Sequence, residues 1–162
     1  MNAPDAVARF REEVRAIAAR YPESRSAVLP ALRLAQERHD GWLPPQALEE
    51  VAEALELTPA YCLAVASFYD MFHLEPVGRH LVEVCTNLPC ALVGAQRVVD
   101  AFAAELGVGA GETTEDGEIA LRVVECLGGC GYAPVVSVDH RYRHHVRPED
   151  AAAIVEELRG QA

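Results

Sequence analysis

Four of the five cysteines lie in two short segments, and this pairing constrains the fold more than any other feature of the chain. The segments are Cys85-Thr-Asn-Leu-Pro-Cys90 and Cys126-Leu-Gly-Gly-Cys130. Four residues separate the first pair, three separate the second, and thirty-five lie between the pairs. Each segment follows an apolar, β-branched run, Leu81–Val84 or Leu121–Val124, so two strands are predicted to end in two thiol-bearing loops. Four thiolates that converge from adjacent loops can hold a metal ion or an iron–sulfur cluster.

Length and composition describe a folded, acidic chain. Its 162 residues fit one domain or two small ones, and a hydrophobic content of 51% is enough for a packed core. The net charge of −11 argues against a nucleic-acid partner, because phosphates repel an acidic protein. No apolar run approaches the roughly 18 to 20 residues of a membrane helix, so no direct membrane span is expected.

The first five residues, Met-Asn-Ala-Pro-Asp, do not have the basic and apolar regions of a secretory signal. We therefore expect a cytoplasmic protein. In that compartment structural disulfides are disfavoured, and clustered cysteines more often bind metal or carry out redox chemistry.

The first half of the chain is predicted to be helical, because apolar residues recur at helical spacing in four short segments. The first segment begins at Asp5 and stops before Tyr21-Pro22, and the second covers about residues 24–39. The third opens at Pro44-Pro45 and the fourth at Thr58-Pro59. Short loops and one apolar face per helix predict a small antiparallel bundle.

Two features of the helical half need an interpretation of their own. Cys62 lies inside the fourth predicted helix, and we expect it to be a buried small hydrophobe rather than a ligand. The segment Ser67–His73 contains two phenylalanines, a tyrosine and a methionine just before a linker at residues 75–78. It is either a plug that docks the bundle on the second domain or an anchor for a partner protein, and the sequence leaves both open.

The second half of the chain mixes strands and helices. The turn Asp139-His140 between the third and fourth predicted strands indicates a hairpin. The predicted fold class is α+β: a helical bundle domain over residues 1–75, followed by a thioredoxin-like α/β domain with a four-stranded mixed sheet over residues 76–162. Strands are predicted at residues 81–84, 119–125, 135–138 and 142–146, and helices at 91–106 and 147–158.

The spacing of the four thiols is compatible with three kinds of site. A [2Fe–2S] cluster is favoured by Gly128, Gly129 and Gly131, which let backbone N–H groups turn toward the sulfurs. A structural zinc site with four cysteines suits the same spacing. A pair of disulfides or a redox dithiol is the weakest of the three, because no Cys-x-x-Cys motif is present.

No other cofactor site is predicted. His144 and His145 are adjacent, so in a strand they point to opposite faces, and no histidine is assigned a ligand role. The glycine-rich residues 107–111 follow a helix instead of a strand, which is the wrong context for a dinucleotide. The chain is therefore expected to bind neither a nicotinamide nor a flavin itself.

The motifs resemble a known family. Val84-Cys-Thr-Asn-Leu-Pro-Cys90 followed by Cys126-Leu-Gly-Gly-Cys-Gly-Tyr-Ala-Pro-Val-Val136 is similar to the E-type subunits of NADH:quinone oxidoreductase (respiratory complex I), of the thioredoxin-like [2Fe–2S] ferredoxin family. The resemblance includes Ser26–Leu32, Gly41–Leu43 and Ala66–Phe72, and so covers roughly residues 20–158.

The resemblance implies that Cys85, Cys90, Cys126 and Cys130 ligate one [2Fe–2S] cluster. It implies an electron-transfer role in NADH oxidation and quinone reduction, beside the F-type flavoprotein of complex I that binds FMN and NADH, with other peripheral-arm subunits as further partners. The chain would be part of an oxidoreductase (translocase) without holding a complete active site, on the cytoplasmic side of a bacterial inner membrane. Leu88 departs from the family, which often has a small or hydroxyl residue there.

Two alternatives to this function are kept. The same motif suits the equivalent diaphorase subunit of an NAD-dependent hydrogenase or formate dehydrogenase. A zinc-stabilised binding module with four cysteine ligands and no redox role is also compatible with the spacing.

Overall fold

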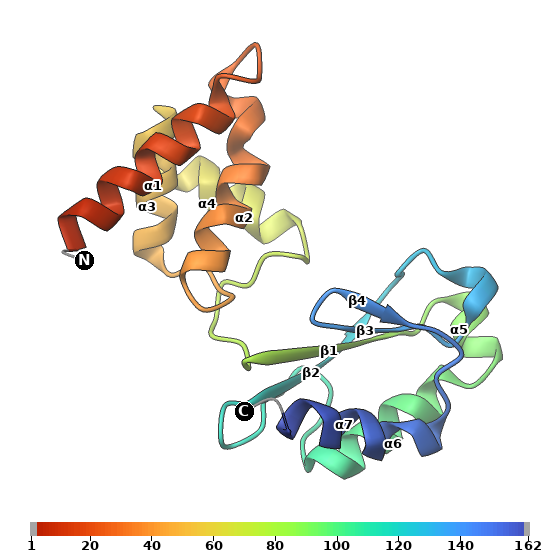
Figure 1. Ribbon diagram of the computed structural model, residues 1–162. Helices are drawn as coiled ribbons and strands as arrows, with labels where there is room; N and C mark the ends of the chain where they lie inside the picture. The colour runs from red at the N-terminus through yellow and green to blue at the C-terminus, as the bar shows by residue number, and fades with distance from the viewer. Residues whose placement is uncertain (1–2, 161–162) are drawn as a thin grey trace. The chain divides into compact units, whose positions relative to one another are not determined.

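The computed structural model describes residues 3–160 (Figure 1). The chain separates into two compact units, Met1–Pro76 and Val77–Ala162. The first unit is entirely helical, and the second contains the sheet and both cysteine segments.

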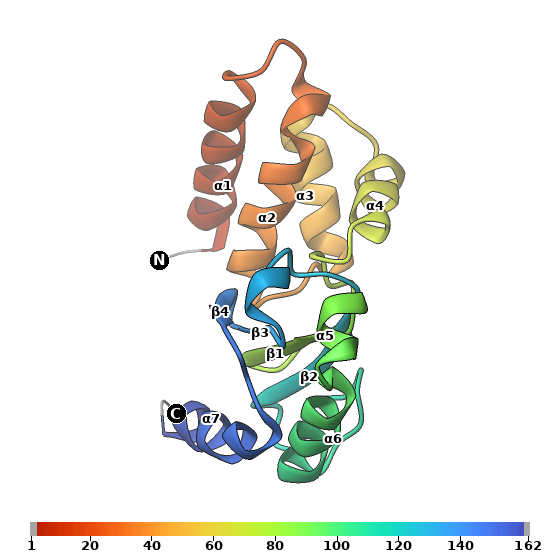
Figure 2. The same cartoon turned by 90° about the vertical axis from the view of Figure 1, so that its right-hand side faces the viewer.

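The first unit is a bundle in which each helix packs against its neighbours (Figure 2). Proline occupies the first turn of the third and fourth helices, and the Thr58 hydroxyl caps the fourth by accepting from the Tyr61 N–H at 3.2 Å. The core is apolar and includes Phe10, Leu32 and Leu55. The elements are α1 (Ala3–Ala18), a 3₁₀ turn η1 (Ser24–Ala27), α2 (Val28–Arg38), α3 (Pro45–Leu55) and α4 (Pro59–Phe68).

Two helices differ from the sequence prediction. The second helix was predicted to start near residue 24. Residues 24–27 instead form a 3₁₀ turn, and the α-helix begins only at Val28. The expectation of a single apolar face fails at α4, which is apolar on all sides, so that Leu63 is 45% exposed while Cys62 is buried.

The turn after α4 is held by one buried side chain. The amide of Gln36, on α2, donates to the Met71 carbonyl at 3.0 Å and accepts from the His73 N–H at 2.8 Å. The His73 carbonyl in turn accepts from the Leu43 N–H at 2.7 Å. Phe72, between the two bonded positions, packs into the helical core. Of the segment Ser67–His73, Phe72 is therefore part of the bundle's own core, while Phe68 is exposed.

The second unit is a four-stranded mixed sheet covered by helices, as predicted. The strand order is β2-β1-β3-β4, with β1 and β2 parallel and the other neighbours antiparallel. Helices α6 and α7 pack side by side, and α6 also contacts β1 and β2 (Figure 1). The elements are β1 (His80–Cys85), α5 (Leu88–Leu92), α6 (Ala95–Leu106), β2 (Ile119–Val124), η2 (Cys130–Tyr132), β3 (Val136–Val138), β4 (Arg141–Arg143), η3 (Pro148–Asp150) and α7 (Ala151–Arg159).

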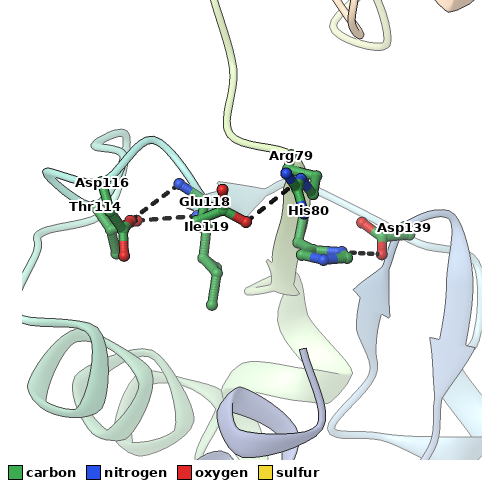
Figure 3. Close-up of polar contacts among 7 residues, drawn as sticks. All are labelled: Arg79, His80, Thr114, Asp116, Glu118, Ile119 and Asp139. Atoms are coloured by element: carbon green, nitrogen blue, oxygen red, sulfur yellow. Dashed lines mark hydrogen bonds and ion pairs between the residues drawn. The ribbon is translucent and has the colours of Figure 1, made fainter. Parts of the chain in front are cut away.

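The end of the sheet opposite the cysteines is fixed by carboxylates (Figure 3). Asp139, in the β3–β4 turn, accepts from the Leu81 N–H at 2.9 Å, and its other oxygen lies 2.8 Å from His80 Nδ1. Asp139 and His140 both have positive φ, which is the conformation of the predicted two-residue hairpin turn. Before β2, the Ile119 N–H donates to the Thr114 hydroxyl at 3.0 Å. These contacts hold the start of β1 against the β3–β4 turn and hold the segment that enters β2.

The predicted helix at 91–106 is interrupted. Gly94 adopts φ +97° and separates α5 from α6, which Figure 2 shows as two helices. Because of this break, Leu92 and Val93 do not reach the packed face predicted for them, and they are 78% and 51% exposed. The predicted strand at 142–146 is also shorter, since β4 ends at Arg143.

Within residues 3–160, no single helix is long and apolar enough to cross a membrane. Only α3 and α4 taken together, across a bend of 116°, have the length and composition of a span.

Candidate metal centre

The two cysteine loops leave the sheet at the same edge. β1 and β2 are parallel neighbours, and Cys85 is directly opposite Val124 in their register. The Thr86 N–H donates to the Val124 carbonyl at 3.0 Å, so the pairing continues to the last residue before each loop diverges. Because parallel strands end at a common edge, Cys126 enters its loop beside the start of the first loop.

The first pair of thiols is buried. Cys85 and Cys90 form a small apolar cluster with Ala95, packed against Val124 and other partly buried side chains. The Cys85 N–H donates to the Val135 carbonyl at 3.1 Å, which ties the end of β1 to the segment entering β3. Cys90 is placed by the first turn of α5, a turn that the Asn87 side chain caps.

Electrostatics link three of the four thiols. Burial raises the pKa of the Cys90 thiol above its ordinary value, and a hydrogen bond with Cys85 and the charges of Cys85 and Cys130 raise it further. A backbone hydrogen bond with Val135 acts in the opposite direction. The charge of the Cys130 thiolate thus makes it harder to ionise the buried Cys90 thiol. A bound cation would reverse this effect, because it stabilises thiolates.

The second loop depends on its glycines. Gly128 has φ +74°, and its N–H donates to Cys126 Sγ at 3.3 Å, the kind of backbone-to-sulfur contact expected from the sequence. A Cβ on Gly129 would lie 2.9 Å from Cγ2 of Val135, so only glycine fits there without a shift. Cys126 and Cys130 themselves are exposed.

The four thiols share an edge but are not in a closed arrangement. Within the described part of the chain, no three Cys, His, Asp or Glu side chains lie in a ready metal-binding group. The donor set nevertheless fits a soft metal centre in its chemistry, because four sulfur donors suit iron–sulfur clusters and zinc. In such a centre Cys85 and Cys90 would be the buried ligands, and Cys126 and Cys130 would be the exposed ones.

The two sequence segments that contain the four thiols are uncharged. The segments Val84–Gln96 and Cys126–Val138 contain no Asp, Glu, Lys or Arg, although 24% of the whole chain is charged. Within these two segments Leu92, Val93 and Tyr132 are exposed.

The sequence model of the thioredoxin-like [2Fe–2S] ferredoxin family matches residues 14–159. The chain belongs to this family. The E 2 subunit of NADH-quinone oxidoreductase from Rhizobium meliloti is 43% identical over 150 residues, covering 93% of this chain and 89% of the relative. The E subunit of NADH-quinone oxidoreductase from Mycobacterium bovis is 44% identical over 156 residues, covering 96% of this chain but only 62% of the longer relative.

A solved structure resembles this ferredoxin in fold. A chain of the NAD⁺-reducing [NiFe]-hydrogenase in the H₂-reduced state superposes with a TM-score of 0.74 over 83% of this ferredoxin at 24% identity. The match takes up 22% of the hydrogenase chain. The likeness supports the mixed α/β architecture described above.

The other candidate ligands of this ferredoxin lie outside the cysteine loops. Cys62 is fully buried in the helical core, and burial raises the pKa of its thiol, as expected for a residue that packs as a small hydrophobe. Of the histidines, His140, His144 and His145 are exposed, and His144 stacks on the ring of Tyr132. That contact was not expected from the sequence.

Proposed function

We propose that this ferredoxin is the electron-transfer subunit of the NADH dehydrogenase module of a respiratory complex I, with one [2Fe–2S] cluster held by Cys85, Cys90, Cys126 and Cys130. The observation that supports it most is the common sheet edge at which both cysteine loops end, in a chain 43% identical to an E-type subunit over 93% of its length. In this assignment residues 1–75 are a helical domain, and residues 76–162 are the ferredoxin domain.

The chain's own residues have distinct tasks in this proposal. When bound, the cluster supplies one-electron exchange. Cys85 and Cys90 keep water from one side of the site because both are buried. The Gly128 N–H already points at Cys126 Sγ, and such hydrogen bonds to sulfur stabilise its negative charge and raise a reduction potential.

The proposed partner is the F-type flavoprotein of complex I, which binds FMN and NADH, within an assembly of other peripheral-arm subunits. The uncharged, exposed side chains of Leu88, Leu92 and Val93 border the first cysteine loop and suit a dry contact with another protein. The chain would act on the cytoplasmic side of the inner membrane as a peripheral subunit, with no complete active site of its own.

A second host is supported by the fold likeness to the NAD⁺-reducing hydrogenase. In that host the chain would serve the equivalent diaphorase module, with the same cluster and a similar flavin partner. Native co-purification from the source cells separates the two hosts. An FMN-binding subunit accompanied by quinone-reductase subunits supports complex I, whereas a hydrogenase or formate dehydrogenase chain contradicts it.

Ligand assignment is tested by serine substitution in the full chain. We expect Cys126→Ser to lose the cluster or to retain it weakly, because one of four sulfur ligands is removed. Cys62→Ser is the matched control and is expected to keep the wild-type iron content. Equal loss in both variants would show that the ligands are wrongly assigned.

A further inference from the structure

Tyr132 forms an aromatic cluster just after the second cysteine loop. Its ring stacks on His144 with a centroid distance of 4.6 Å and an interplanar angle of 20°. The ring of His145 meets it edge-on at 5.9 Å and 68°. Tyr132 is 55% exposed, so the cluster is built on the surface and is not part of the apolar core. These rings join residues 12 and 13 positions apart in the chain.

Backbone hydrogen bonds join the same two segments that the rings join. The His145 N–H donates to the Tyr132 carbonyl at 2.9 Å, and the Val146 N–H donates to the Pro134 carbonyl at 3.1 Å. On the loop side, the Tyr132 N–H donates to the Gly129 carbonyl at 2.9 Å. Tyr132 therefore links the glycine turn between the second pair of cysteines to the segment that follows β4.

The loop needs such a link because it has little else to restrain it. Cys130 is exposed and is flanked by Gly129 and Gly131. Glycine is the residue type with the greatest backbone freedom. Tyr132 is the first large side chain after Cys130, two residues along within the single turn η2. A contact that fixes Tyr132 thus limits the positions that the Cys130 thiol can take.

We propose that Tyr132, stacked on His144, is a positioning residue for Cys130 and holds this thiol where the iron–sulfur cluster requires it. The inference rests on the proposed function in one respect, namely that Cys130 is a cluster ligand. It assigns a role to a side chain that is not itself one of the proposed ligands. Both rings are needed for the stack, which adds a side-chain contact to the backbone hydrogen bonds of Tyr132.

The test uses the full chain with its cluster and four variants. Tyr132→Leu and His144→Leu each remove the stack, whereas Tyr132→Phe keeps it. Tyr142→Leu is the matched control, because Tyr142 is 50% exposed on β4 and its ring meets no other aromatic ring within residues 3–160. The measurements are the EPR g-values of the reduced cluster, its midpoint potential and the rate of iron release to a chelator.

We expect Tyr132→Leu and His144→Leu to release iron roughly two- to tenfold faster than the wild type, which corresponds to the loss of one aromatic pair. Both should shift the g-values and the potential in the same direction. Tyr132→Phe should match the wild type, and the double Leu variant should be no faster than Tyr132→Leu, since that change alone already removes the stack.

The outcomes separate this inference from the proposed function. If the wild type holds a cluster but Tyr132→Leu and Tyr142→Leu have the same g-values, potential and iron release, Tyr132 is not a positioning residue. If the wild type holds no iron and no sulfide, the proposed function fails, and the inference fails with it. His144→Leu guards against a folding artefact, because His144 lies outside the cysteine loops.

Discussion

Cys85 lies directly opposite Val124 in the parallel register of β1 and β2, so the two cysteine loops begin side by side although thirty-five residues separate them. This pairing, more than the spacing of the cysteines, makes one site from two loops.

Gly129 is expected to tolerate no side chain. Its Cβ in Gly129→Ala would meet Cγ2 of buried Val135 at 2.9 Å, and such overpacking typically costs about 1–3 kcal/mol. Chemical denaturation of the apo chain measures the loss. Gly131→Ala is the control, because nothing lies within 4 Å of its Cβ, and it should change stability by less than about 0.5 kcal/mol. Gly129→Ala should cost less in a Val135→Ala background than in the wild type, and an equal cost in both backgrounds would contradict the proposed clash.

Asp139 is expected to stabilise the sheet through its carboxylate. Asp139→Ala removes the acceptor of the Leu81 N–H and the partner of His80, with an expected loss of about 1–2 kcal/mol, given the partial exposure of Asp139. Urea unfolding provides the value. His140→Ala controls for the strain of alanine at positive φ, because both residues have that conformation. Equal effects of the two changes would mean that the carboxylate contributes nothing.

Gln36 is expected to fix the turn that follows α4. Gln36→Leu fills similar space but removes the acceptor of the His73 N–H and the donor to the Met71 carbonyl. Losing these partners in a largely buried position should cost about 1–3 kcal/mol. Thermal and urea unfolding measure it, with Gln96→Leu at an exposed position of α6 as the control. A Gln36 variant as stable as the Gln96 variant would show that the Gln36 side chain does not stabilise the turn.

Cys62 is expected to matter for packing and not for the cluster. Cys62→Ala should retain the wild-type iron and sulfide content, because this thiol lies in the helical core. It should lower the unfolding free energy by about 1 kcal/mol, since a small buried group is lost. Metal analysis and denaturation of the same preparation give both numbers. Loss of iron without loss of stability would contradict this assignment.

Hydrophobic periodicity and turn chemistry were sufficient to predict the class of fold. The runs before Cys85 and Cys126 do form strands, β1 and β2, and Asp139-His140 does form the hairpin turn. Both signals are local, which is why they can be read from residue order. The packing role predicted for Cys62 agrees with its complete burial.

The errors arose where a single backbone angle or a distant contact decides the outcome. Gly94 at φ +97° breaks a segment whose periodicity is continuous, and this exposes Leu92. Leu63 is exposed because α4 is apolar on all sides and only Cys62 and Ala66 of this helix are buried, so its own sequence does not show which side is covered. The stack of Tyr132 on His144 joins two segments through the sheet topology, so no local pattern could predict it.

The iron and acid-labile sulfide content of the anaerobically purified full chain tests the central claim most directly. One [2Fe–2S] cluster on Cys85, Cys90, Cys126 and Cys130 predicts about two iron and two sulfide per chain, with an EPR signal on reduction by dithionite. One zinc per chain with no labile sulfide and no EPR signal would contradict it, and would make the four thiols a structural zinc site.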